Sequence, residues 1–342
     1  MIHGVLLAAA LCRPTVFRAD GTRSSAALRG PGLVLSGGGL SGMPRAAVLA
    51  WMRARIAAPP GTRAGNLLIL KASDNERYYT DTFYRESRFA RVQEIFIPPC
   101  ATRAQVDAIA PYVDAADDVL FSGGDQAHYV PWKGSKLIAA VRRVYARGGV
   151  IGGGSAGLAI QGEVVFDSVA ADRDLPDDED VATPDAVRNP YEASISFTTG
   201  FLDWPPMRDT ITDSHVARRN RFGRLTAFMA RILRDGLVRG STIYGVAVDE
   251  GAALLVDSRG IASLVERKRE DDGYVPKGAW IVKGGRAQRI RPRVPLLYTV
   301  NVTHLGAGMR YDLRAKRALG GTTYRVTVNG AATPMYSRNP YR

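Results

Sequence analysis

The chain is poor in cysteine and histidine. Its 342 residues include two cysteines, Cys12 and Cys100, which are too few for the disulfide frameworks of small secreted domains. The four histidines stand at positions 3, 128, 215 and 304, so none has a neighbour at the short spacing of a zinc motif. We therefore expect no structural zinc, no other bound metal and no cofactor.

Lysine is also scarce, and a long hydrophobic run is absent. Only seven of the 46 basic residues are lysines, and the arginines extend from Arg13 to Arg342 without gathering in one stretch. The formal net charge of +13 comes without a nucleic-acid-binding motif, so we expect no nucleic-acid partner. With 46% hydrophobic and 23% charged residues, and no apolar run of membrane-spanning length, the composition is that of a globular protein without a membrane span.

The N-terminus carries a short apolar segment, MIHGVLLAAALC, that has two explanations of equal merit. Ala8 and Ala10 fit a small-residue cleavage site, but no Lys or Arg precedes the run, so both a weak secretory leader and a mis-set start codon fit. Leu11 before Cys12 disfavours a lipoprotein signal. A real leader predicts a secreted or periplasmic protein, and otherwise a cytoplasmic location is expected. Residues 1–30 are set aside as a leader or disordered tail.

Short apolar strands alternate with helical patterns from residue 31 onward, which predicts a mostly parallel sheet covered by helices in three layers. The expected strands are Gly32–Ser36, Asn66–Lys71, Glu94–Pro98, Asp118–Phe121 and Val150–Ile151. Amphipathic patterns predict helices over Lys136–Arg147 and Val216–Leu233, and strands follow from Ile243. We expect a main α/β domain over residues 31–257 and a β-rich extension over residues 258–342 that packs on it.

The segment Gly152–Gly157 (GGGSAG) is the sharpest candidate for chemistry. It lies between the strand ending at Ile151 and an apolar stretch that we expect to be helical, which is the arrangement of a nucleophile elbow. Such a turn lifts the hydroxyl of Ser155 clear of the sheet and points backbone N–H groups at one place, where they stabilise an oxyanion. A phosphate-binding turn or a merely tight turn gives the same pattern, so the motif alone leaves both open.

Two further polar segments accompany the elbow. Phe121–Gln126 (FSGGDQ) follows the preceding strand, so Gly123 and Gly124 are expected beside the elbow at the carboxyl edge of the sheet. Their amides and that of Ala156 are the candidate oxyanion donors. His215 stands in the segment ITDSHVARRNRFGRL, at the start of the long predicted helix, and is the favoured base for a serine nucleophile.

Five segments resemble the cyanophycinase-like group of serine peptidases, relatives of aspartyl dipeptidase (dipeptidase E). They are FSGGDQAHYVPWKGS, GGGSAGLAIQGE, NPY, ITDSHVARRNRFGRL and GVAVDEGAALLV, and they occur in consistent order over about residues 32–256. The resemblance implies a flavodoxin-like sheet of the class I glutamine amidotransferase-like type. It also implies a nucleophilic Ser155, a base at His215 and an acidic residue that orients the imidazole. A class I amidotransferase itself is excluded, because the elbow carries serine and not cysteine.

The resemblance places the acidic member of the triad before the NPY segment. The family pattern matches Asp185 in TPDAVRNPY. Glu192 and Asp167 are the fallback candidates. A solvated loop charge explains each of the three equally simply.

The resemblance implies a peptide or isopeptide substrate with an aspartyl carboxylate, because its members cleave β-aspartyl-arginine units or peptides with an N-terminal Asp. It places Gln126 on the substrate, and we expect Asp125 and Ser214 to line the same site. Arg218 follows the base and is suited to pair with a carboxylate. Three departures from the family pattern bear on the shape of the pocket: Gly154, Val216 and Asn220. The oligomeric state is open, with a homodimer as one option.

Two other functions fit parts of the sequence. An esterase or lipase of the α/β-hydrolase type has the same chain order of serine, acid and histidine, with His304 as its base. A non-catalytic protein would use the turns Gly37–Gly39 and Gly152–Gly154 to hold an anion or a nucleotide. His128 is a further candidate base. The long helix predicted after His215 and the GGDQ segment argue against the esterase.

Overall fold

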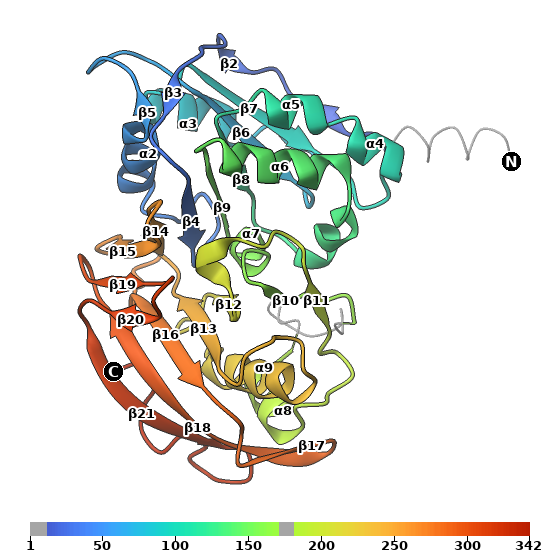
Figure 1. Cartoon of the computed structure of the whole chain (residues 1–342), viewed down its shortest axis with the longest axis vertical. Coiled ribbons are helices and arrows are strands. Elements are labelled where there is room, and N and C mark those ends of the chain that lie inside the picture. Colours follow the sequence, from blue (N-terminus) through green and yellow to red (C-terminus); the bar gives the residue numbers. More distant parts are fainter. Residues whose placement is uncertain (1–11, 171–180) are drawn as a thin grey trace, which may run out of the picture.

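The computed structural model describes residues 12–170 and 181–342 and contains two large sheets (Figure 1). The centre of the first sheet is parallel, in the order β7-β6-β8-β9-β4. Its strands are β4 (Gly32–Ser36), β6 (Asn66–Lys71), β7 (Arg91–Phe96), β8 (Asp118–Phe121) and β9 (Val150–Gly154). Every residue of these five strands is buried except Arg91, the first residue of β7. The continuous apolar runs predict such burial for a sheet that is covered on both faces.

Helices cover both faces of this parallel sheet. Helices α2 (Arg45–Ala54) and α3 (Thr80–Glu86) pack on one face, and α4 (Arg103–Asp107), α5 (Ala110–Asp114) and α6 (Lys136–Ala146) pack on the other. Successive side chains of β4 enter opposite cores, with Leu33 and Leu35 beside α4, α5 and α6, and Val34 beside α2 and α3. The predicted α/β class and its layered arrangement are therefore present.

The strand order agrees only in part with a flavodoxin-like sheet. Strands β7-β6-β8-β9 follow the 2-1-3-4 portion of the flavodoxin order. In the flavodoxin order, the next place in the sheet holds the last parallel strand of the chain. Here that place holds β4, which precedes the other four strands in the chain. The flavodoxin-like assignment therefore stays a prediction.

Antiparallel strands extend the first sheet. They are β1 (Thr15–Val16) and β2 (Asp20–Gly21) beside β7, and β14 (Ala252–Val256), β15 (Ile261–Glu266), β19 (Arg310–Asp312) and β20 (Arg317–Ala318) beyond β4. A separate short pair joins β3 (Ala27–Leu28) to β5 (Ile56–Ala57).

The second sheet has the order β11-β10-β12-β13-β16-β18-β17, with β21 paired to β18. Its strands are β10 (Val164–Phe166), β11 (Phe197–Thr199), β12 (Thr210–Ser214), β13 (Ile243–Val248), β16 (Ala279–Gly284), β17 (Arg289–Arg291), β18 (Val294–Leu305) and β21 (Thr322–Asn329). Strands β10, β12 and β13 are parallel, and the later ones are antiparallel. Residues 258–342 thus contribute strands to both sheets, as the orange and red ribbons of Figure 1 show.

The other described helices follow the parallel strands. They are α7 (Ala156–Ala159), α8 (Thr183–Arg188) and α9 (Phe222–Arg234), with short 3₁₀ turns η1 (Gln126–His128), η2 (Val130–Trp132) and η4 (Pro205–Met207). Helices α8 and α9 pack on the second sheet, and α7 is in contact with strands of both sheets. Helix α9 begins at Phe222 and not at the predicted Val216. The reason is local, because His215 and Asn220 have φ of 52° and 50°, which no right-handed helix accommodates. Strand β7 also ends before the predicted Pro98, since proline has no N–H for the ladder.

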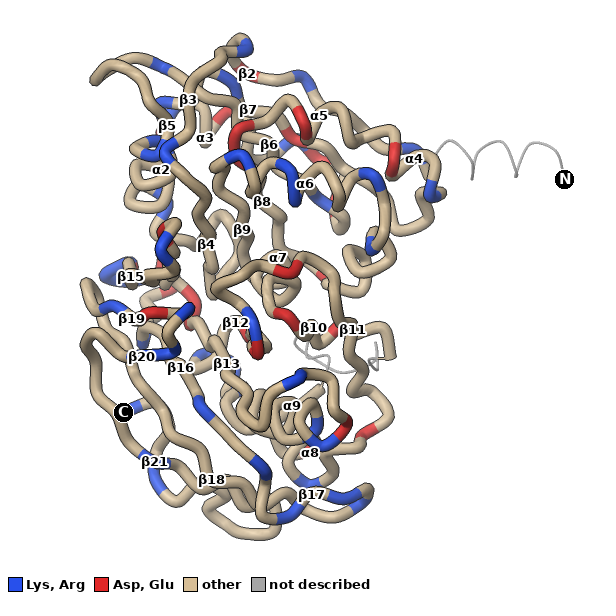
Figure 2. The backbone as a smooth tube through the Cα atoms, in the orientation of Figure 1, with Lys and Arg blue, Asp and Glu red and all other residues tan. Residues whose placement is uncertain are grey.

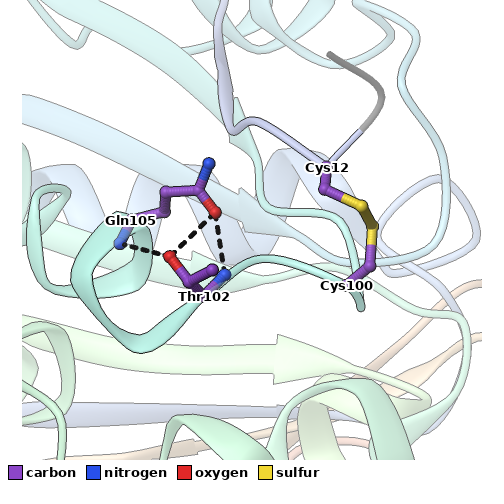
Figure 3. The surroundings of a disulfide bond; sticks show 4 residues. All are labelled: Cys12, Cys100, Thr102 and Gln105. Atoms are coloured by element: carbon purple, nitrogen blue, oxygen red, sulfur yellow. Dashed lines mark hydrogen bonds between the residues drawn. A yellow bond between two sulfur atoms is a disulfide. The ribbon is translucent and has the colours of Figure 1, made fainter. Parts of the chain in front are cut away.

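The described part of the N-terminal segment belongs to the fold. Residues 12–30, which the sequence led us to set aside, supply β1 and β2 to the first sheet and β3 to the short pair. Cys12 is disulfide-bonded to Cys100, as Figure 3 shows. The bond joins the segment before β1 to the loop after β7. Residues 1–11, where the leader was considered, lie outside the described residues.

The Cys12–Cys100 disulfide is expected to stabilise the protein measurably. Cys12→Ser combined with Cys100→Ser should lower the free energy of unfolding by roughly 2–5 kcal/mol, because the bond restricts the unfolded chain over a separation of 88 residues. Urea denaturation of both proteins measures the difference, and dithiothreitol should destabilise only the wild type. Detection of two free thiols in the unreduced wild type, by alkylation and mass spectrometry, would contradict the pairing.

The basic residues are distributed over the whole molecule. Figure 2 shows Lys and Arg on both the upper and the lower parts of the tube, in agreement with their dispersal in the sequence. Across the part of the chain that the structure describes, no helix has the length and apolar composition needed to cross a membrane.

Candidate active site

The candidate site lies where strands of both sheets reach their carboxyl ends. Ser155 follows β9, His215 follows β12, and Glu250 comes two residues after β13. The position of Ser155 after a strand agrees with the sequence prediction, whereas His215 was expected at the start of the long helix, which begins only at Phe222. Because β12 and β13 are parallel neighbours, their ends lie side by side, which brings Glu250 beside His215.

Ser155 occupies a sharp turn between β9 and α7. Its backbone has φ 54° and ψ −114°, a sparsely populated conformation for a residue with a side chain. The preceding glycines allow the turn to form against neighbouring backbone. A Cβ at Gly153 would overlap the carbonyl oxygen of Phe121, and one at Gly154 would overlap that of Gly38. The strand, tight turn and helix expected from the GGGSAG pattern are therefore present.

The backbones of Ser155 and His215 are anchored to consecutive residues at the end of β4. The Ser155 N–H donates to the carbonyl oxygen of Ser36 at 3.2 Å, and the His215 N–H donates to that of Gly37 at 2.9 Å. His215 also has a positive φ of 52°. A Cβ at Gly37 would overlap the carbonyl oxygen of Asp249, so the segment after β13 packs directly on this turn. The Gly37–Gly39 run therefore holds the candidate residues in register through close backbone packing.

The three side chains form one continuous chain of hydrogen bonds. Ser155 Oγ lies 2.9 Å from His215 Nε2, and His215 Nδ1 lies 2.6 Å from Glu250 Oε2. His215 is only 6% exposed, whereas the Glu250 side chain is 23% exposed, so the hydrogen bonds are partly shielded from solvent. An imidazole that donates from Nδ1 to a carboxylate presents a basic Nε2 to the hydroxyl. The arrangement is able to activate Ser155 as a nucleophile.

The protonation states suit this arrangement near neutral pH. Burial lowers the pKa of His215 below its ordinary 6.5, although the hydrogen bond to Glu250 opposes the shift. The hydrogen bond from His215 lowers the pKa of Glu250 below its ordinary 4.5, although burial opposes it. At pH 7 the imidazole is therefore neutral and the carboxylate is ionised, as a general base and its partner require.

The pH profile of activity is expected to reflect the lowered pKa of His215. Protonated imidazole cannot accept the Ser155 proton, so the midpoint of the acidic fall in kcat/KM should lie below pH 6.5, the ordinary pKa of histidine. Initial rates across pH 4–8 measure this, with the folded fraction checked at each pH. An apparent pKa above 6.5 on the acidic side would contradict the burial argument.

The structure places Glu250, and not Asp185, against the imidazole. Asp185 lies in α8 with its side chain 50% exposed, and its carboxylate is 3.4 Å from Arg188. The expectation for the acidic residue is corrected on this geometric ground. The reason is that the acid follows the histidine in the chain and reaches it through strand pairing, whereas the family pattern had led us to look between the serine and the histidine.

The two fallback acids also lie in other surroundings. The amide of Asn189 lies 3.5 Å from a carboxylate oxygen of Glu192. Asp167 accepts hydrogen bonds from the hydroxyls of Ser196 and Thr198. Neither contacts the imidazole. A polar residue directly after a buried strand, the signal used for the serine, also marks the Asp-Glu pair after IYGVAV.

Gly123 lies beside the serine, as expected of an oxyanion donor. A Cβ at Gly123 would be 3.5 Å from Ser155 Cβ and 3.8 Å from Gly39 Cα. Gly124 has φ 116°, and a Cβ there would overlap the hydroxyl of Ser73. Ala156 is the first residue of α7, next to the serine. Gly123 and Ala156 thus lie next to Ser155, Gly124 follows Gly123 in the chain, and the role of the three amides as oxyanion donors stays a prediction.

The expected substrate residues have partners within the protein. Asp125 caps η1 by accepting from the Ala127 N–H at 2.8 Å, and it also accepts from the Ser168 hydroxyl at 2.7 Å. Gln126 begins η1 and is 6% exposed. Ser214 ends β12 and is buried.

Arg218 is held by acidic side chains of the protein. Its guanidinium forms an ion pair with Asp272, and its Nε lies 3.6 Å from Glu250 Oε2. Arg218 therefore faces the candidate triad from the side of the acid, and a substrate carboxylate would have to compete with Asp272 for it.

A buried ion pair fixes the end of β12. The guanidinium of Arg224 donates to both carboxylate oxygens of Asp213, at 2.9 and 2.7 Å, and the two residues are 2% and 4% exposed. Two parallel N–H···O bonds restrict orientation as well as distance. Because Asp213 comes two residues before His215, the pair stabilises the strand end that carries the imidazole.

The residues that the two alternative functions require either lie away from Ser155 or serve in backbone packing. The ring of His304 stacks on Trp280 with centroids 5.0 Å apart, and its Nε2 is 2.6 Å from the carbonyl oxygen of Lys277. It is His215 that contacts Ser155. The two glycine runs pack on each other, since a Cβ at Gly154 would overlap the Gly38 carbonyl. Within residues 12–170 and 181–342, no group of three or more His, Cys, Asp or Glu side chains is arranged to hold a metal ion.

Comparison with known proteins gives distant structural similarity. No protein-family model matches the chain, and no curated protein matches it in sequence. The chain is similar to a peptidase from an acI-B1 Actinobacterium, with 15% identity, a TM-score of 0.45, and coverage of 84% of this chain and 98% of that one. It is also similar to a "Putative Peptidase E Protein" from Listeria monocytogenes EGD-e, with 12% identity, a TM-score of 0.40, and coverage of 70% and 100%. Both neighbours are described as peptidases. Because the sequence identities and TM-scores are low, the function of this chain has to be argued from its own site.

Proposed function

We propose that this protein is a serine peptidase of the cyanophycinase-like type that hydrolyses an aspartyl peptide or isopeptide bond. The observation that carries the proposal is the hydrogen-bonded series from Ser155 through His215 to Glu250 at the carboxyl ends of three strands. Its distances of 2.9 and 2.6 Å are those required between a nucleophile, its base and an orienting carboxylate. The five sequence segments that resemble the cyanophycinase-like group support the finer assignment.

The proposed reaction is acyl transfer to water. His215 Nε2 accepts the Ser155 proton as the hydroxyl oxygen attacks the scissile carbonyl carbon, and the imidazolium that forms is stabilised by Glu250. The amides of Ala156 and of Gly123 or Gly124 donate to the oxyanion. The imidazolium then protonates the leaving amine. In the second half of the reaction, His215 accepts a proton from the water molecule that attacks the acyl group, and it returns this proton to Ser155 Oγ as the acyl group leaves.

The proposed substrate carries a carboxylate near the scissile bond. Three arginines follow the base, and they differ in their surroundings. Arg218 is paired with Asp272, and Arg221 is 4% exposed with its guanidinium directed at the Ser214 carbonyl oxygen, 3.3 Å away. Arg219 is half-buried, and its N–H donates to the carbonyl oxygen of His215 at 2.8 Å, so it lies next to the base in the turn. We assign Arg219 to the substrate carboxylate, because Arg218 is paired with Asp272 and Arg221 is buried.

We further propose that the protein resides in an oxidising compartment. Disulfides such as Cys12–Cys100 persist in secreted and periplasmic proteins and are rare in the cytosol. The disulfide therefore favours export over the cytoplasmic alternative. Intact mass of the protein isolated from its native host would show whether the first residues are removed.

Substrate profiling tests the proposal. The purified protein is assayed on β-aspartyl-arginine, on Asp-X dipeptides and on simple esters, with Ser155→Ala as the control for contaminating activity. We expect hydrolysis of at least one aspartyl substrate, and loss of that activity in the variant. Turnover of esters without any aspartyl peptide would support the esterase alternative and overturn the substrate assignment.

A further inference from the structure

The loop between β15 and β16, residues 267–278, lies against the acid side of the candidate triad. Asp272, on this loop, forms an ion pair with Arg218, with 3.3 Å between Nη1 and Oδ1 and a second contact through Nη2. The Nε of the same guanidinium lies 3.6 Å from Glu250 Oε2. That oxygen is also the one 2.6 Å from His215 Nδ1. One carboxylate oxygen of Glu250 is therefore shared between the imidazole and an arginine that the loop holds.

A second contact joins the loop to the backbone of the site. The hydroxyl of Tyr274 donates to Asp249 Oδ2 at 2.6 Å, and the Arg218 guanidinium lies over the Tyr274 ring at 4.8 Å. Asp249 is fully buried, and its Oδ1 accepts the N–H groups of Ala217 and Arg218 at 3.1 Å each. Lys277 donates its N–H to the other oxygen at 2.9 Å. Asp249 thus ties the loop to the turn that follows the base, and it directly precedes the acid.

We infer that Asp272 and Tyr274 are positioning residues of the proposed active site, acting through Arg218 and Asp249 on Glu250 and His215. The inference rests on the proposed function. It assigns a role to the chain after residue 257, where the resemblance to the peptidase group has ended.

The physical reason is competition for one carboxylate oxygen. With Asp272 present, Arg218 is held between two carboxylates, and Glu250 keeps its short contact with the imidazole. Without Asp272, Coulomb attraction draws the guanidinium to Glu250 alone, so the carboxylate stabilises the imidazolium less well. Loss of the Tyr274 hydroxyl removes one of four donors to a buried carboxylate, which loosens the turn that carries the base.

The test compares Asp272→Asn with Asp271→Asn. Both remove one negative charge from the same loop, but the Asp271 side chain is 94% exposed and pairs with Arg267. The measured quantity is the second-order rate constant for labelling of Ser155 by a fluorophosphonate, which needs no known substrate. We expect a decrease of about tenfold in Asp272→Asn and in Tyr274→Phe, as for other partners that orient an active group, and no change in Asp271→Asn. Thermal unfolding confirms that each variant is folded.

A double-mutant cycle separates positioning from general destabilisation. If Asp272 acts through the guanidinium, Asp272→Asn should have no further effect in an Arg218→Met background. On a cleaved substrate, kcat should fall while KM stays level, because these residues act on Glu250 and His215 through Arg218 and Asp249 and do not contact the substrate. Equal labelling rates in Asp272→Asn and wild type, or fully additive effects in the cycle, would overturn the inference. A wild type that is not labelled at Ser155 would instead refute the proposed function.

Discussion

Glu250→Gln is expected to lower kcat by roughly three to four orders of magnitude, whereas Asp185→Asn leaves it unchanged. The amide of glutamine keeps the size of the side chain but removes the charge that stabilises the imidazolium. It also permits the wrong tautomer of His215, with the proton on Nε2, where it cannot accept from Ser155. Asp185 is exposed and paired with Arg188, so its charge does not reach the site.

Initial rates on an aspartyl substrate, or labelling rates with a fluorophosphonate, measure both variants. Glu192→Gln and Asp167→Asn serve as further controls, because neither carboxylate contacts the imidazole. Circular dichroism and thermal unfolding show whether a loss reflects misfolding. If Asp185→Asn were inactive and Glu250→Gln active, the acid would be the one expected from the family pattern, and the geometry described above would not be the active one.

His215→Ala should reduce kcat by roughly five to six orders of magnitude, while His304→Ala retains activity. Ser155 Oγ then has no base, because its hydrogen-bond partner is the imidazole of His215. His304 in β18 stacks on Trp280 of the neighbouring strand β16, so its removal costs packing and not proton transfer. Burst and steady-state kinetics on the same substrate quantify both.

The comparison also decides between the peptidase and the esterase with a C-terminal base. Each variant is assayed on an aspartyl peptide and on a simple ester. Loss of ester hydrolysis in His304→Ala, together with an active His215→Ala, would establish the alternative base.

The sequence alone predicted the features whose signals are local. Strands β4, β6 and β8 have the predicted ends, because each is a short apolar run bounded by turn residues. The turn at Ser155 followed from glycines directly after a strand, a pattern complete within a few residues. His215 was selected in part because the chain has only four histidines. The structure places its Nε2 2.9 Å from Ser155 Oγ.

Features that depend on distant strands could not be predicted in the same way. Glu250 reaches His215 because β12 and β13 are parallel neighbours, and strand pairing is not encoded in local periodicity. The pairing of Cys12 with Cys100 across 88 residues has no local signal either. The start of α9 was predicted too early, since amphipathic spacing continues through a turn in which Asn220 has positive φ.

The site also depends on a part of the chain that the motifs did not reach. Asp272 and Tyr274 come from the loop between two strands of different sheets, and their contacts with Arg218 and Asp249 form only after both sheets are assembled. We therefore expect truncation directly after β15, which removes this loop together with β16, to abolish activity even though all three residues of the proposed triad remain. Because β16 pairs with β13, such a truncation also exposes the edge of the second sheet.

The most direct measurement is the intact mass of the protein after reaction with a fluorophosphonate, followed by peptide mapping. A serine hydroxyl activated by a neighbouring imidazole predicts one added phosphonyl group per chain, located on Ser155, and no addition in Ser155→Ala or His215→Ala. An unmodified wild-type protein that is fully folded, or a label on any other residue, would contradict the account of a serine nucleophile at the end of β9.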